Sequence, residues 1–208
     1  QGGMLRLADL PLEDAPIDLV RQLNAVGAIE REYRDSIAPA VPHDGQGLAP
    51  TEFFNWSEEL RTLRPQLHGL EHWEHIEHQM IAPRVNQALQ ALSHQLTGAL
   101  SERWEAWRDR YIPELLSLLR GLRREATERS RARTAAIARV IDPLLPEARR
   151  TETISRKSLW TLVGTPGVTC VLNGMRTPQY VEDSLAVLKW GPPAQTRVVY
   201  EQEKTVAL

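Results

Sequence analysis

Apolar residues recur every three or four positions through most of the chain, from about residue 16 to residue 145. This spacing gathers them on one face of a helix and leaves the other face polar. The first run contains Leu19, Leu23, Val26, Ile29, Tyr33 and Ile37, the second Trp56, Leu60, Leu63, Leu67 and Leu70, and the third Val85, Leu89, Leu92, Leu96, Leu100, Trp104, Trp107 and Tyr111. Several amphipathic helices in series predict an antiparallel helical bundle with these residues, the tryptophans included, in its core.

Prolines and glycines mark where these helices are expected to stop. The stretch 39–50 (PAVPHDGQGLAP) has the composition of a loop or linker, after which a second helix is expected to open at Thr51. Pro65 and Gly69 lie inside the second apolar run and predict a kink or a break there.

The third run predicts one long helix. It is expected to begin at Pro83 and to continue to Tyr111 as a rod of roughly 40 Å at 1.5 Å per residue. Pro113 then predicts a bend or a new start, and residues 135–141 predict a further short helix.

The C-terminal region has a different pattern. A Pro166–Gly167 turn precedes a β-branched run, Val168–Leu172, which predicts a strand. A polar loop, 173–177, follows, and Pro178 occupies the expected first position of a helix. Free N–H groups at a helix start, together with the helix dipole, favour an anion at such a loop.

The residues from Thr165 to Trp190 resemble the last β/α unit of the aldo/keto reductases, whose (β/α)8 barrel ends in a strand, a loop and a helix that hold NADP. Family members typically carry Gly-Val-Thr, then a Gly-containing loop, a basic residue, Ser or Thr, and Pro. This chain reads Gly-Val-Thr from Gly167 and Asn-Gly-Met-Arg-Thr-Pro from Asn173. Barrel enzymes place a phosphate site at this end of the fold.

The resemblance implies roles for individual residues. Gly174 and Met175 are expected to give main-chain N–H groups to the adenosine phosphate, and Arg176 to face the 2′-phosphate. Thr177 is expected to cap the helix or to touch phosphate. Tyr180 stands where the family usually has Gln or Arg, and Ser184 stands where it has an adenine-binding Asn.

No motif matches the family's catalytic Asp, Tyr, Lys and His, and a single predicted strand cannot close an eight-stranded barrel. The resemblance therefore implies an NADPH-dependent oxidoreductase whose N-terminal barrel part lies outside this chain. The chain alone has no predicted catalytic residue and is expected to be inactive.

The predicted fold class is mainly α, a helical bundle followed by one C-terminal β/α unit. Residues 13–150 form the bundle, 151–191 the reductase-like unit and 192–208 an extended tail. Residues 1–12 resemble a barrel loop after the family's seventh strand, or include a remnant of a cleaved tag at Gln1–Gly2.

Four histidines, His68, His72, His75 and His78, share an arc of a predicted helix, opposite an apolar arc that ends at Met80. Imidazoles at i and i+4 can share a metal ion, but the established His-Glu-x-x-His and Glu-x-x-His spacings are absent. A solvated, pH-sensitive face, a metal site and a partner-binding face all remain open. The last two define the alternative function, a non-enzymatic helical interaction module.

Charge limits the other function classes. The net charge is −2, which argues against a general nucleic-acid or membrane-surface binder. The Arg-rich run 121–139 contains interleaved glutamates and no aromatic residue that could stack on bases, so it predicts a charged outer helix face.

The lone Cys170 predicts a small buried side chain and a reducing, cytoplasmic location. The sequence contains no predicted membrane span.

Overall fold

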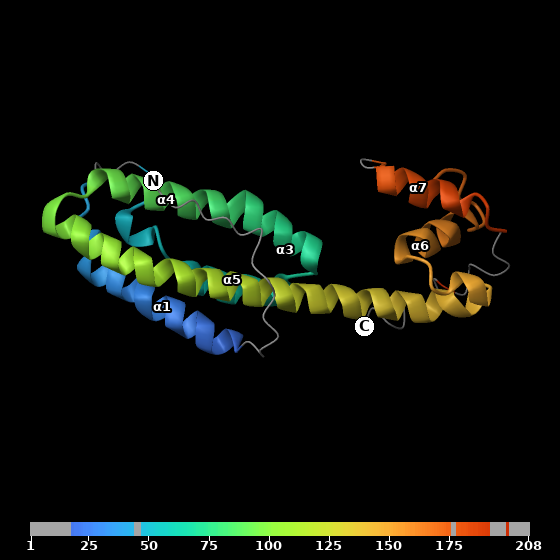
Figure 1. Ribbon diagram of the computed structural model, residues 1–208, viewed down its shortest axis with the longest axis horizontal. Coiled ribbons are helices and arrows are strands. Elements are labelled where there is room, and N and C mark those ends of the chain that lie inside the picture. The colour runs from blue at the N-terminus through green and yellow to red at the C-terminus, as the bar shows by residue number, and fades with distance from the viewer. Residues whose placement is uncertain (1–17, 44–46, 176–177, 192–198, 200–208) are drawn as a thin grey trace. The chain divides into compact units, whose positions relative to one another are not determined.

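The computed structural model describes residues 18–43, 47–175, 178–191 and 199, and within them the chain is mainly helical, as the pattern predicts (Figure 1). The helices are α1 (Leu19–Ser36), α2 (Trp56–Leu63), α3 (Leu70–Ile76), α4 (Ala82–Gln95), α5 (Gly98–Ile141), α6 (Ile154–Val163) and α7 (Pro178–Val187). Short 3₁₀ turns are η1 (Ala38–Ala40), η2 (Pro50–Glu52), η3 (Arg64–Gln66), η5 (Asp142–Leu144) and η6 (Glu147–Arg149), and η4 (Glu77–Ile81) is a π-helical turn. The chain divides into two compact units, residues 1–130 and 131–208, so residue 150 lies inside the second.

The predicted rod from Pro83 to Tyr111 is wrong, because the chain reverses between α4 and α5. Gly98 adopts a φ of 61°, a left-handed conformation that glycine enters without steric penalty. The indole N–H of Trp104 donates to the hydroxyl of Ser93 across the reversal, at 3.1 Å. The apolar pattern continues through the turn because both helices face one core, and periodicity alone therefore conceals the break.

Pro113 does not restart the helix, one of the two predicted outcomes. It lies inside α5, which continues through residues 135–141 and leaves no separate short helix there. Tyr111 and Leu115, on either side of the proline, are completely buried. We attribute the continuity of the helix to this packing, which compensates for the hydrogen bond that proline cannot donate.

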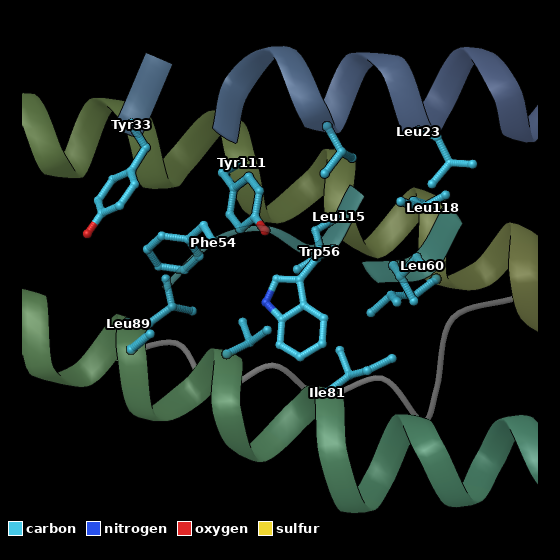
Figure 2. Packing of buried hydrophobic residues seen from close by; sticks show 14 of the residues in the cluster. Leu23, Tyr33, Phe54, Trp56, Leu60, Ile81, Leu89, Tyr111, Leu115 and Leu118 are labelled. Carbon is cyan, nitrogen blue, oxygen red and sulfur yellow. The ribbon is translucent and has the colours of Figure 1, made fainter. Parts of the chain in front are cut away.

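The core of the first unit lies where α1 and α5 run antiparallel. The side-chain amide of Gln22 donates to the hydroxyl of Ser117 at 2.7 Å. Aromatic rings fill the centre, and Figure 2 shows Phe54 and Trp56 between the helices. Phe54 lies 4.8 Å from Trp107, and Trp107 stacks on Tyr111 at 4.5 Å between ring centroids. The predicted core tryptophans Trp73, Trp104 and Trp107 are confirmed.

One carboxylate lies inside this core. Glu30 is 1% exposed. Its Oε1 accepts from the main-chain N–H of Trp56 at 2.8 Å and from the Tyr111 hydroxyl at 2.9 Å, and its Oε2 accepts from the N–H of Ser57 at 3.1 Å. The Asn55 side chain at the N-cap of α2 makes no capping bond. Glu30 therefore satisfies, from α1, the donors that a local cap would otherwise satisfy.

The Glu30 carboxyl is expected to make stability depend on pH. Burial, the largest influence, raises the pKa of Glu30 above its ordinary value of 4.5, although the hydrogen bonds from Ser57, Tyr111 and Trp56 act to lower it. A carboxyl group with a raised pKa in the folded state adds stability below its unfolded pKa, and this is lost as pH rises through the folded value. Urea unfolding of wild type and Glu30→Gln is measured from about pH 4 to 8. The free energy of unfolding of wild type should fall relative to that of the variant as pH rises. A difference that stays constant over this range would contradict the assignment.

The π-helical turn η4 changes which residues face the core. Met80, predicted on the apolar arc, is 50% exposed, whereas Glu77 is 2% exposed. The wider π turn rotates the following side chains away from the positions that a regular helix gives them. Glu77 accepts from the Arg123 guanidinium at 3.3 Å, and Arg123 also pairs with Glu74. Burial raises the pKa of Glu77, and Arg123 opposes that shift.

The second unit has a smaller core. Its buried apolar residues among those described are Ile141, Leu145, Trp160, Val187 and Val199. The indole N–H of Trp160 donates to the carbonyl of Gly191 at 2.7 Å. The buried Lys157 donates to Asp142 at 2.7 Å. A hydrogen bond and an ion pair therefore supplement the few buried apolar side chains of this unit.

Candidate functional site

The residues between α6 and α7 form the candidate site that the sequence indicates. The Pro166–Gly167 turn is present, with a φ of 89° at Gly167. Residues 168–172, predicted as a strand, carry no regular secondary structure. A strand is defined by its main-chain partners, and the main chain of 169–172 makes no hydrogen bond to any described residue. Cys170 is exposed for the same reason, so its predicted burial is wrong.

The loop and the helix start follow the predicted order. Gly174 has no heavy atom within 4 Å of the position that a Cβ would occupy, and Met175 is exposed. Arg176 and Thr177 lie outside the described residues. Helix α7 begins at Pro178, and Tyr180 in its first turn is exposed. Gly174, Met175 and Tyr180 are thus accessible beside the first turn of a helix.

Ser184, the predicted adenine-contacting position, is placed differently. It is buried, and its hydroxyl accepts from the Asn173 side-chain amide at 2.5 Å and donates to the carbonyl of Tyr180 at 2.7 Å. Both hydrogen-bonding directions of the hydroxyl are therefore used within the unit. Ser184 ties the loop to α7 and also lines the cavity beside the loop.

A cavity of about 430 Å³ lies behind the loop. Its wall contains Trp160, Val168, Val171, Met175 and Val187, and none of the lining residues that the structure describes is charged. The described lining offers an anion no cationic partner and suits an apolar group.

Sequence reasoning missed an ion-pair chain that braces α7. Arg156 donates from Nε to Asp183 at 2.9 Å and from Nη1 to Glu152 at 2.7 Å. Asp183 is buried, so its charge is partly desolvated. It pairs with the Arg156 guanidinium, whose orientation is also fixed by Glu152. The only signal in the sequence was an acidic residue beside the Ser184 position, which does not reveal its partner 27 residues earlier.

The four histidines do not converge. His68, His75 and His78 are exposed and His72 is half-buried, which places the cluster away from the core, as predicted. His68 and His72 stack with 5.1 Å between ring centroids, and His78 Nδ1 lies 2.8 Å from the Glu74 carbonyl. Within the described residues, no three His, Cys, Asp or Glu side chains are grouped to hold a metal ion.

The Arg-rich run is not only an outer face. Arg129 donates to the carbonyls of Arg64 at 3.0 Å and Leu67 at 2.8 Å, at the end of the α2–η3 segment. Arg64 in turn pairs with Glu125 at 2.8 Å. Together with Arg123, these contacts join α5 to the neighbouring helices, whereas residues 131–135 are exposed. The first half of the run is therefore structural.

The first unit also contains a cavity of about 710 Å³ between residues 41–53 and α4. The guanidinium carbon of Arg84, on its wall, lies 4.5 Å from the centroid of the Trp56 ring. The guanidinium also donates two hydrogen bonds to the Glu59 carboxylate, at 3.0 and 3.1 Å. The guanidinium is thus already paired with a carboxylate and an aromatic face.

No known family model, curated protein or solved structure matches this chain. No helix in the described part of the chain combines the length and apolarity that crossing a membrane requires.

Proposed function

We propose that residues 165–190 are the cofactor-phosphate end of an aldo/keto reductase-like, NADPH-dependent oxidoreductase. In this proposal the loop 173–177 and the start of α7 hold the adenosine phosphates, and Arg176 pairs with the 2′-phosphate. The catalytic residues and the remaining strands of the (β/α)8 barrel come from outside this chain. The 208-residue chain contributes cofactor affinity and no catalytic group.

The observation that carries the proposal is the order of elements from α6 to α7. A helix ends at Val163, residues without regular secondary structure and a Gly-bearing loop follow, and the next helix begins at Pro178. The loop and the helix follow in the order that the sequence resemblance implies, whereas residues 168–172 form no strand. Because the first N–H groups of a helix lack partners within it, the start of α7 presents donors to an anion held by the loop.

The exposed apolar surface of the second unit is a further support. Leu172 is 96% exposed, and Leu185 and Leu188 on the α7 side are exposed as well. Isolated units of this size with a small core are marginally stable. Apolar residues at these positions are consistent with a surface that neighbouring barrel elements would cover.

Arg176→Ala is expected to weaken NADPH binding much more than NADH binding. Losing one charge-assisted contact costs about 1.5–3 kcal/mol, or roughly a 10- to 150-fold increase in Kd. NADH has no 2′-phosphate, so its Kd is expected to change less than about twofold. Calorimetric titration of both cofactors into wild type and variant measures this difference, and tryptophan fluorescence provides a second signal.

Arg139→Ala is the matched control, because it removes one exposed arginine from the same unit that is not part of the loop 173–177. Its NADPH affinity should equal that of wild type. Equal loss of both cofactors in Arg176→Ala would exclude the role of Arg176. Failure of wild type to bind either cofactor would leave the proposal without support in this chain and favour the alternative helical interaction module.

A further inference from the structure

The cavity of about 710 Å³ in the first unit has the size of a small-molecule site, since such sites usually enclose roughly 300–1,000 Å³. Helix α4 forms one wall, and described residues between positions 41 and 53 form the other. None of the described lining residues belongs to the segment 165–190, to which the cofactor phosphates are assigned. The cavity therefore has no part in the proposed oxidoreductase function.

The α4 wall combines short side chains with uncharged amides. Gln87, Ala91 and Gln95 follow one another at intervals of four residues, which places them along one face of the helix. Ala88 and Ala91 leave room in front of the helix because their side chains are short. The two glutamines are about 12 Å apart along the helix axis at 1.5 Å per residue. Their amides can donate and accept hydrogen bonds, so they suit neutral polar groups at two ends of a ligand.

The opposite wall is apolar and locally fixed. Its described apolar residues are Val41, Pro42, Leu48, Pro50 and Phe53. The main-chain N–H of Phe53 donates to the carbonyl of Pro50 at 3.3 Å, and that of Val41 donates to the carbonyl of Ala38 at 3.1 Å. Small-molecule sites are usually apolar and largely formed before the ligand arrives, and the half-buried Phe53 offers a ring for an aromatic ligand to pack against.

The charge of the lining indicates which ligands fit. Arg84 is the one Asp, Glu, Lys or Arg side chain in the described lining. Its guanidinium already donates two hydrogen bonds to the Glu59 carboxylate and lies against the Trp56 ring. An anion entering the cavity would lose hydration without gaining an unpaired cation. The described lining therefore favours an uncharged ligand.

We propose that this cavity binds an uncharged aromatic small molecule, and that the pairing of Arg84 with Glu59 makes the site discriminate against anions. The rings of the ligand pack against Phe53 and the alanines of α4, and its neutral polar groups pair with Gln87 and Gln95. The site does not rest on the proposed function, since all of its described residues lie in the first unit.

Two fluorescent probes with the same rings test the charge preference. N-phenylnaphthylamine is uncharged, whereas anilinonaphthalene sulfonate adds one sulfonate to this ring system. The 208-residue chain is titrated into each probe and the probe emission is followed. We expect saturable binding of the neutral probe and a Kd at least about tenfold larger for the sulfonate. Equal or tighter binding of the sulfonate would overturn the proposal, as would a neutral probe that does not bind saturably.

Ala91→Phe is expected to raise the Kd of the neutral probe at least about tenfold, because the larger side chain fills the cavity. Ala91 is half-buried on the cavity wall. Ala99→Phe is the matched control, since Ala99 is an exposed alanine of α5 outside the described lining, and this variant should bind like wild type. Circular dichroism checks that both variants fold. Unchanged binding in a folded Ala91→Phe would place the probe elsewhere and exclude this site.

Glu59→Gln tests the role of the ion pair and keeps the test decisive if Ala91→Phe fails to fold. The substitution leaves the Arg84 guanidinium without its counter-charge. The Kd of the sulfonate probe should therefore fall at least about fivefold, while that of the neutral probe stays within about twofold of wild type. Glu58→Gln, at an exposed neighbour on α2 that pairs with Arg61, is the matched control and should change neither Kd. Equal sulfonate binding by the two variants would contradict the proposal.

Discussion

Trp107→Ala is expected to lower the free energy of unfolding by roughly 3–5 kcal/mol, the usual range for removing a buried tryptophan. Trp107 is almost completely buried in α5 and lies within 5.0 Å of the Tyr33 ring and 5.2 Å of the Trp104 ring. Its indole N–H donates to the carbonyl of Ile29 at 2.8 Å, which links α5 to α1. The substitution therefore removes a ring from the centre of the core and the hydrogen bond that links α5 to α1.

Urea unfolding followed by circular dichroism measures this loss as a lower midpoint at a similar slope. Trp107→Phe keeps an aromatic ring but removes the donor, and is expected to lose about 1–3 kcal/mol. Val20→Ala, at an exposed position on α1, should stay within about 0.5 kcal/mol of wild type. If Trp107→Ala resembled Val20→Ala, the packing of α1 on α5 would be wrong.

Glu30→Ala is the second large expected effect, a loss of roughly 3 kcal/mol or more at neutral pH. The alanine leaves the N–H groups of Trp56 and Ser57 and the Tyr111 hydroxyl without an acceptor inside the core. Each buried donor left unpaired costs about 1–3 kcal/mol, and the removal of the buried wild-type charge offsets part of the total.

Glu32→Ala is the matched control for this substitution. Glu32 lies on the same helix two residues away, but it is exposed and pairs with Arg110 at the surface. An exposed ion pair of this kind contributes at most about 1 kcal/mol. Equal unfolding midpoints for Glu30→Ala and Glu32→Ala would show that Glu30 does not cap α2 from α1.

The helical pattern was sufficient to predict where the first unit buries its side chains. Leu23, Leu60, Leu92 and Trp104 were all expected in the core, and all are buried. Apolar periodicity predicts the core because burial of one helix face is the dominant stabilising contribution. The position of each residue in the helical repeat decides whether it lies on that face. The same signal misplaced Met80, since one π turn rotates a face without altering the residue spacing.

The candidate site was predictable in part. The Pro166–Gly167 turn, the exposed loop at Gly174 and the start of α7 at Pro178 follow from local conformational preferences of proline and glycine. The state of residues 168–172 did not follow, since a strand requires a partner that composition cannot supply. The roles of Arg176 and of the cofactor remain predictions of the resemblance.

The sequence by itself determined that this protein is mainly helical, where α4 and α7 begin and which side chains form the core of the first unit. These properties depend on residues within a few positions of one another, so spacing alone records them. Only the tertiary structure decided that the chain reverses at Gly98, that Glu30 caps a helix 26 residues away, and that Arg129 binds the carbonyls of another helix. Such contacts join residues far apart in the chain. Their free energy depends on how deeply the groups are buried and how far apart they lie in space, which the local spacing of residues does not specify.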